Sequence, residues 1–339
     1  MQVETLRTKT PLKDSRPTGV KGNRGHLIQG SLLGCPKTKR RALLALSSAR
    51  PPQLNFHQST TKTPRKLIME TQKRFDSPSD LRLACREGRF QQQTAGMCPG
   101  FAQAGLTALP KALAFDFLLF CTRNPEACSL IEVTDPGSPT PPTLAKSADL
   151  RKDIAMYRVT ANGQDQNSSS SEVLTVSDAE KYWRPDLVSF LLGCSFSFED
   201  ALAAAGIPVR HIEEGVTVPM YITNRQCKPS GPFKAPLVVS MRPMTPSQAL
   251  LAVKVTSRHR LSHGAPIHLG SPADIGIKNI DEPDFGNKVT MKEGEIPVFW
   301  ACGLSAQLAL KNANPELAIT HAPGYMFISD VTTEELCLR

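Results

Sequence analysis

The sequence predicts a mixed α/β and α+β fold with two lobes, an α/β layered sandwich and a smaller α+β lobe. Two observations support this prediction. Segments with the spacing of strands alternate with segments that carry helix caps, which is the order expected when helices cover a mixed sheet. The chain of 339 residues is also long enough to bury the cores of two lobes.

The first 75 residues differ in composition from the rest of the chain. They hold 16 of the 40 Lys and Arg residues but only three of the 31 acidic residues, so the remainder carries a small net negative charge. An acid-poor segment rich in Arg, Ser and Thr is typical of a mitochondrial transit peptide, and a disordered extension is the alternative. We therefore expect residues 1–75 to precede a folded body of residues 76–339 and the protein to reside in the mitochondrial matrix, with the cytoplasm as the alternative location.

Composition argues against several classes of partner. The basic residues lie on the N-terminal extension, whereas a nucleic-acid-binding domain carries its basic patch on the fold itself. No stretch approaches the roughly 20 apolar residues that span a bilayer. No GxGxxG follows a strand and no Walker loop is present, so we expect no nucleotide cofactor. The oligomeric state stays open, a homo-oligomer included.

The first half of the body shows helix signals more clearly than strand signals. Residues 91–110 are rich in small side chains, which favours a loop or a close-packed backbone segment over a core element. Pro110 suits the first turn of a helix. The expected elements are helices over 78–88, 110–123 and 186–192, a strand over 128–133, and a polar surface loop over 160–180.

The stretch from 193 to 215 combines a turn, a short helix and a charged segment. Ser197 is placed to cap a helix whose first turn holds Glu199, and Gly206 suits its C-terminal end. Residues 209–214 then alternate apolar and ionisable side chains with the period of a strand. We expect a strand there that holds titratable groups at a fixed distance from the helix.

The last third repeats strand and helix. Thr245 and Gln248 form a capping box with proline at the first helical position, and the flanking strands complete a strand–helix–strand unit. The expected elements are strands over 218–223, 236–242, 266–269, 297–300, 317–320 and 325–329, and helices over 245–260 and 305–312.

Polar side chains gather beside glycine or proline at four element ends, where a backbone can approach a ligand. Taken singly, each His fits a structural hydrogen bond and the Arg fits a surface ion pair. Together they indicate an anionic small-molecule site with acid/base capacity. The four segments are 210–214, 240–243, 263–268 and 320–324.

Other chemistries have weaker support in the sequence. His263 and His268 are five residues apart and lie on no obvious helix, so the i, i+4 geometry of a zinc site is missing. No GxSxG elbow of a hydrolase occurs. Cys194 and Cys302 fit buried small residues better than nucleophiles. We therefore expect no metal.

Several long runs of sequence, taken in order along the chain, resemble the D-glutamate cyclase family, in its mitochondrial-type animal form. The runs are TAGMCPGFAQAGLTALPKALAFDFLLFCTRNPEAC, LLGCSFSFEDALAAAGIPVRHIEEG, PLVVSMRP, HGAPIHLGSPADIGI, EIPVFWACG and THAPGYMFISD. The resemblance covers about residues 77–330. Phe101 and Gly105 stand where many relatives have Tyr and Asn.

The resemblance implies cyclisation of D-glutamate to 5-oxo-D-proline with loss of water and without a cofactor. The alternatives are a hydro-lyase acting on another small carboxylate and a non-catalytic carboxylate-binding protein. The implied reaction needs cations for the carboxylates, a base for the amine and an acid for the departing oxygen. The binding candidates are Arg210, Asn224, Arg242, His263 and Trp300. The catalytic candidates are His211, Glu213, Glu214, His268 and His321.

Overall fold

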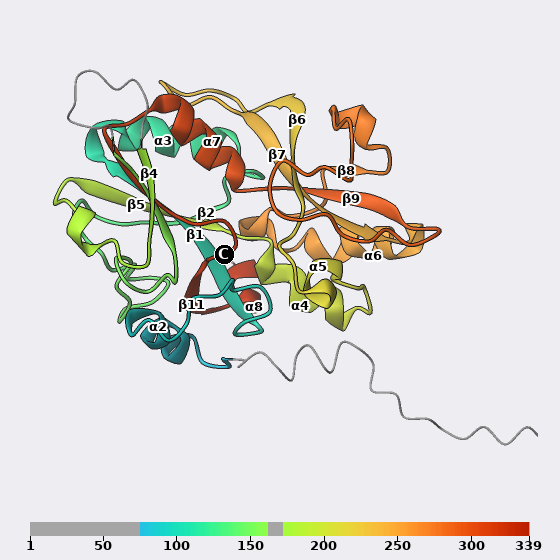
Figure 1. The fold of residues 1–339 in the computed structure, drawn as a ribbon, viewed down its shortest axis with the longest axis horizontal. Helices are drawn as coiled ribbons and strands as arrows, with labels where there is room; N and C mark the ends of the chain where they lie inside the picture. Colours follow the sequence, from blue (N-terminus) through green and yellow to red (C-terminus); the bar gives the residue numbers. More distant parts are fainter. Residues whose placement is uncertain (1–74, 162–171, 339) are drawn as a thin grey trace, which may run out of the picture. The chain divides into compact units, whose positions relative to one another are not determined.

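The computed structural model describes residues 75–161 and 172–338, which belong to one compact unit (Figure 1). The mixed fold expected from the sequence is confirmed, because helices accompany two separate antiparallel sheets. The expected extension of residues 1–75, apart from Phe75, and the centre of the expected 160–180 loop lie outside the described residues. Within the described part, no helix is long and apolar enough to cross a membrane.

The larger sheet has the order β2-β5-β1-β10-β3-β4, and β11 also pairs with β1. All its pairings are antiparallel. Its strands are β1 (Phe101–Pro110), β2 (Leu130–Val133), β3 (Tyr157–Ala161), β4 (Glu172–Val176), β5 (Leu187–Gly193), β10 (Leu317–His321) and β11 (Phe327–Thr332).

Two expectations for this sheet were wrong. Residues 101–110 form the central strand β1 rather than a loop, with nine of ten residues buried, because its Ala and Gly residues let neighbouring layers pack closely. The helix expected over 186–192 is strand β5, whose seven residues are all buried. A strand covered on both faces reads as a continuous apolar run, and its periodicity cannot be told from that of a buried helix.

The smaller sheet has the order β6-β7-β9-β8 with antiparallel neighbours. Its strands are β6 (Met220–Gln226), β7 (Pro236–Met244), β8 (His268–Leu269) and β9 (Ile296–Ala301). The expected strand–helix–strand order of β7, α6 (Pro246–Thr256) and β8 is present, but β9 lies between the two strands. The capping box of Thr245 and Gln248 is confirmed at the start of α6.

Helices cover both sheets (Figure 1). Side chains of α3 and α7 share a core with β1, β5 and β10 of the larger sheet, and side chains of α4 and α6 share one with β9 of the smaller sheet. Besides α6, the described helices are α2 (Pro78–Arg86), α3 (Lys111–Arg123), α4 (Phe196–Ala204), α5 (Arg210–Glu214), α7 (Leu304–Ala313) and α8 (Thr333–Cys337). The 3-10 turns are η1 (Glu180–Tyr182), η2 (Arg260–Ser262) and η3 (Pro272–Ile275).

The strand expected over 209–214 was wrong, because these residues form the short helix α5. Arg210 and His211 are adjacent in sequence yet both buried, which the two faces of a half-exposed strand would not allow. Gly215 adopts a left-handed conformation with φ of 66° and ends the helix.

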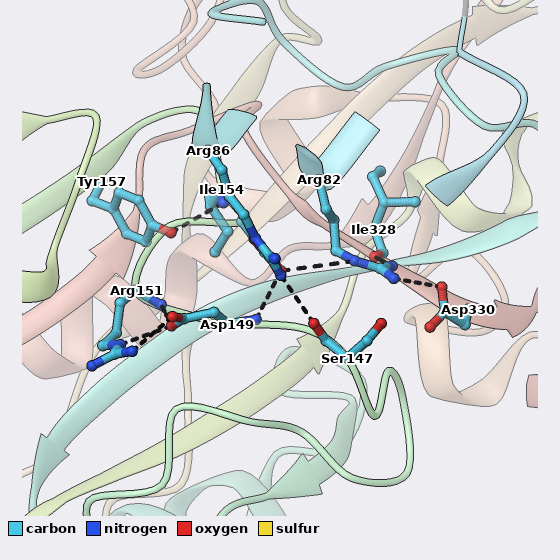
Figure 2. A network of polar contacts seen from close by, with 10 residues as sticks. Arg82, Arg86, Ser147, Asp149, Arg151, Ile154, Tyr157, Ile328 and Asp330 are labelled. Carbon is cyan, nitrogen blue, oxygen red and sulfur yellow. Dashed lines mark hydrogen bonds and ion pairs between the residues drawn. The ribbon is translucent and has the colours of Figure 1, made fainter. Parts of the chain in front are cut away.

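A network of ion pairs attaches α2 to the larger sheet (Figure 2). Arg82 donates to the Ile328 carbonyl at 2.9 Å and pairs with Asp330 at 2.7 Å. Arg86 pairs with Asp153 through Nη2 and Oδ2 at 2.7 Å. Asp153 is fully buried, so the network stabilises the fold, and none of these residues lines the cavity described below.

Candidate functional site

A cavity that is partly open to solvent is lined by residues of both sheets. Its wall includes β1, the end of β5, β7, the start of α7 and the end of β10. Most of the wall is apolar, and a few polar groups converge on it, as is usual for a small-molecule site. The polar side chains that line the cavity are Thr107, Ser195, Thr217, Ser240, His263, Gln307 and His321.

A tight turn brings Ser195 to this cavity. The strand β5 ends at Gly193, where a Cβ would lie 1.6 Å from the Leu261 carbonyl oxygen, so only glycine fits. The expected helix follows as α4, but its N-cap is Ser195 rather than Ser197. The Ser197 hydroxyl instead accepts the backbone N–H of Gln103 at 2.9 Å, which fixes the turn against β1.

Three buried charged or titratable side chains lie behind the turn. Glu199 forms an ion pair with Arg242 and lies 3.2 Å from His211 Nε2. The three side chains are 3%, 0% and 1% exposed. Burial alone would raise the pKa of the Glu199 carboxyl, but the charges of His211 and Arg242 and their hydrogen bonds hold this pKa below its ordinary value. Glu199 is therefore ionised and compensates the charge of Arg242.

The same guanidinium also reaches two residues of the cavity wall. Arg242 donates from Nη2 to Ser195 Oγ at 2.9 Å and from Nη1 to Ser240 Oγ at 3.2 Å. Both hydroxyls accept these bonds, and neither donates a hydrogen bond to any residue that the structure describes. They therefore present polarised O–H donors to the cavity. A buried cation behind two free donors favours the binding of an anion.

Two histidines supply acid/base groups in the same cavity. Nδ1 of His263 lies 2.7 Å from the Glu126 carbonyl, and Nδ1 of His321 lies 3.2 Å from the Leu106 carbonyl. Each Nδ1 must donate to its carbonyl, so each Nε2 carries a lone pair. Burial lowers the pKa of both imidazoles to about 4. Both rings are therefore neutral at pH 7.

The local backbone is adapted to hold both rings. His263 has a φ of 76°, which is rare outside glycine, and its N–H donates to Ser129 Oγ at 2.9 Å. Strained conformations of this kind concentrate at functional sites. At Gly105, a Cβ would lie 2.6 Å from Cε1 of His321. The glycine thus allows the His321 ring to lie against β1.

Of the residues expected at the site, the structure places His263 and His321 in the cavity wall, Arg242 directly behind it, and His211 one step further back through Glu199. Ser195, Thr107 and Gln307 were not among the residues expected at the site, and Ser240 was included only as a member of the segment 240–243. Ser240 precedes Arg242 by two positions on β7, so strand periodicity was the one signal that placed them on the same face.

The other expected residues lie outside this cavity wall. Arg210 pairs with Glu295 at 2.6 Å and with Glu213 at 3.4 Å. Glu214 accepts the Thr290 N–H at 3.1 Å. These contacts fix α5 against the segment that leads into β9.

The remaining candidates have structural surroundings. His268 Nε2 lies 2.7 Å from the Ser271 carbonyl. Asn224 is exposed on β6. Trp300 is fully buried and its indole N–H donates to Thr256 Oγ1 at 3.1 Å. Among residues 75–161 and 172–338, no three His, Cys, Asp or Glu side chains gather as a metal-binding group.

Comparison with known proteins points to one family. The family profile described as D-glutamate cyclase matches residues 188–330, which include the Ser195 turn, Arg242 and both cavity histidines. A Stutzerimonas stutzeri protein named "Putative hydro-lyase" is 51% identical over 261 residues, which are 77% of this chain and 96% of that protein. A Bacillus licheniformis protein named "Putative hydro-lyase BLi00500/BL02808" is 52% identical over 258 residues, which are 76% of this chain and 96% of that protein. A Rubrobacter xylanophilus protein named "Putative hydro-lyase" is 52% identical over 252 residues, which are 74% of this chain and 95% of that protein.

Proposed function

Because the chain belongs to the D-glutamate cyclase family, we propose that it is a lyase that converts D-glutamate to 5-oxo-D-proline and water. One observation supports this most directly. The cavity combines an anion-binding corner, in which Arg242 lies behind Ser195 and Ser240, with two neutral imidazoles. A reaction that binds a carboxylate and moves protons needs these two features and no cofactor.

The protons of this reaction balance within the substrate. At neutral pH the substrate carries an ammonium group and a γ-carboxylate. Two protons leave the nitrogen as the amide C–N bond forms, and the γ-carboxyl oxygen departs with both protons as water. The catalyst therefore only carries protons from nitrogen to oxygen. His263 and His321 each have an unprotonated Nε2 that can accept a proton and return it.

The wall of the cavity assists the same step. The Ser195 and Ser240 hydroxyls donate to one substrate carboxylate, and the fixed charge of Arg242 strengthens both hydrogen bonds. The mostly apolar remainder of the wall displaces water, which strengthens electrostatic interactions with the substrate.

The test is incubation of the purified chain with D-glutamate and chiral chromatography of the product. We expect 5-oxo-D-proline, and we expect His263→Gln and His321→Gln each to lower kcat by about 10²- to 10⁴-fold with little change in melting temperature. The matched control is His268→Gln, whose ring lies outside the cavity.

Two other outcomes would replace the proposal. Dehydration of another small carboxylate, with no product from D-glutamate, would identify a hydro-lyase of different specificity. Binding of carboxylates without turnover of any of them would identify a carboxylate-binding protein that retains the cavity.

A further inference from the structure

A short sequence pattern occurs twice in the wall of the cavity. Residues 194–199 read Cys-Ser-Phe-Ser-Phe-Glu, and residues 302–307 read Cys-Gly-Leu-Ser-Ala-Gln. The first copy joins β5 of the larger sheet to α4, and the second joins β9 of the smaller sheet to α7. The first three residues of each copy line the cavity.

The two copies also make the same backbone contacts. The N–H of Cys194 donates to the Gln103 carbonyl at 3.0 Å, and the N–H of Cys302 donates to the Val238 carbonyl at 3.0 Å. Gln103 and Val238 lie on β1 and β7, the strands that pair with β5 and β9. Each copy is thus fixed to its own sheet in the same way.

The serine of each copy completes this correspondence. Ser197 Oγ accepts the N–H of Gln103 at 2.9 Å, and Ser305 Oγ accepts the N–H of Val238 at 2.9 Å. Neither α4 nor α7 has a side-chain hydrogen bond at its N-cap. The cavity therefore lies between two equivalent helix starts, and the positive end of each helix dipole favours an anion.

A nearly buried hydroxyl without an acceptor accompanies each helix start. Ser195, 5% exposed, accepts from Arg242 but donates to no described residue. Thr107, 1% exposed, lines the cavity, and its hydroxyl has no hydrogen-bond partner among the described residues. Thr107 belongs to the α7 side, because it shares a face of β1 with Gly105, against which the ring of His321 lies, and Gln307 of α7 donates to that ring.

The two copies differ in charge at equivalent positions. In the first copy, Glu199 is ionised and holds the permanent cation Arg242 behind Ser195. In the second copy the equivalent residue is the neutral Gln307, which donates to Nε2 of His321 at 3.3 Å. The α4 corner therefore has a fixed positive charge, and the α7 corner is neutral until its imidazole gains a proton.

We infer that the cavity binds a ligand with two carboxyl groups in one orientation, one group at each corner. This inference rests on the proposed function. The carboxylate that stays unchanged binds at the α4 corner, to Ser195 and Ser240. The carboxyl that loses its oxygen binds at the α7 corner, to Thr107, where His321 delivers the proton that it has taken from the substrate to the departing oxygen. For glutamate, these are the α- and γ-carboxyl groups respectively.

The carboxyl that reacts suits the neutral corner for a physical reason. A permanent cation would stabilise the γ-carboxylate before reaction more than the uncharged amide afterwards, and binding of that kind does not lower the barrier. Thr107 is thereby assigned as a substrate-binding residue, and Gln307 as a positioning residue that orients His321.

The test is isothermal titration calorimetry with three probes: D-glutamate, D-glutamine, which lacks the γ-carboxylate, and D-isoglutamine, which lacks the α-carboxylate. All proteins carry His263→Gln, which is expected to slow turnover of the probes during the titration. We expect Thr107→Val to weaken the binding of D-glutamate and D-isoglutamine about tenfold and to leave the binding of D-glutamine unchanged. We expect Ser240→Ala to weaken the binding of D-glutamate and D-glutamine about tenfold and to leave the binding of D-isoglutamine unchanged.

A second variant tests the α7 corner through its charge, and it also replaces the amide that donates to His321 by a carboxylate. Gln307→Glu adds a negative charge at the α7 corner and should weaken the binding of D-glutamate but not that of D-glutamine. The opposite pattern of affinity losses would show that the ligand binds in the reverse orientation. Equal losses for all probes would show that the cavity does not have two distinct corners. Unaltered melting temperatures exclude misfolding. Since binding is the readout, the pattern can hold even where D-glutamate proves not to be a substrate.

Discussion

Replacing Glu199 by Gln removes the buried carboxylate on which Arg242 depends. The guanidinium would keep only two serine hydroxyls and the ring faces of Phe198 and Trp300, at 5.3 and 5.4 Å, as partners. Removal of one member of a buried ion pair costs about 3–5 kcal/mol. A Gln carbonyl can still accept one hydrogen bond, so we expect a loss in unfolding free energy of about 3 kcal/mol.

The loss should depend on pH in a definite direction. The pKa of Glu199 is lower in the folded protein than the ordinary 4.5. A carboxyl of this kind contributes stability above its unfolded pKa and loses it as the pH falls through the folded pKa. The difference between wild type and Glu199→Gln should therefore be complete at pH 7 and should shrink below pH 4.5.

The measurement is urea denaturation followed by circular dichroism at pH 7 and again at acid pH. The matched control is Glu316→Gln, because Glu316 pairs with Arg184 at 2.6 Å while 66% exposed. A surface pair of this type contributes about 0–1 kcal/mol. The reasoning is refuted if both variants lose the same small amount at pH 7, or if the Glu199→Gln difference does not change with pH.

Three further predictions follow from single contacts. Gly193→Ala would place a Cβ 1.6 Å from a backbone oxygen and should lower the melting temperature severely. Gly303→Ala is the control, because no atom lies within 4 Å of its new Cβ, and it should leave the melting temperature nearly unchanged. Differential scanning calorimetry compares the two variants. Asp153→Ala removes a fully buried partner of two arginines. It should lower the free energy of unfolding by about 3 kcal/mol, and limited proteolysis should cleave the variant near α2 earlier than the wild type. Because the imidazoles of His263 and His321 have a pKa of about 4, kcat/KM should fall only as the pH approaches that value; an inflection near 6.5 in the pH profile would contradict this.

The fold was predictable where local signals act alone. The capping box of Thr245 and the helix after Pro110 need only neighbouring residues, and the structure confirms them. The strands β1 and β5 were misread because burial on both faces removes the alternation that marks a strand. Residues 209–214 were misread because two adjacent ionisable residues are both buried in α5.

The site was predictable only in part for a similar reason. His263 and His321 stand beside glycine or proline, and that local feature indicated a ligand-facing turn. Glu199 gave no such signal, since its role comes from contact with Arg242, 43 residues away. Contacts between distant elements decide which polar residues of a sequence meet, and periodicity carries no information about them.

The position of Arg242 behind the cavity wall has a consequence for binding. A guanidinium that projected into the cavity would be mobile and hydrated before the ligand arrived, and ordering it would reduce affinity. Here Glu199, Ser195 and Ser240 fix the guanidinium in advance, and the two hydroxyls convert its charge into directed donors. Lysine has its three donors on a single nitrogen and cannot span these three acceptors with the planar geometry of arginine. The corner therefore requires arginine for its geometry as much as for its charge.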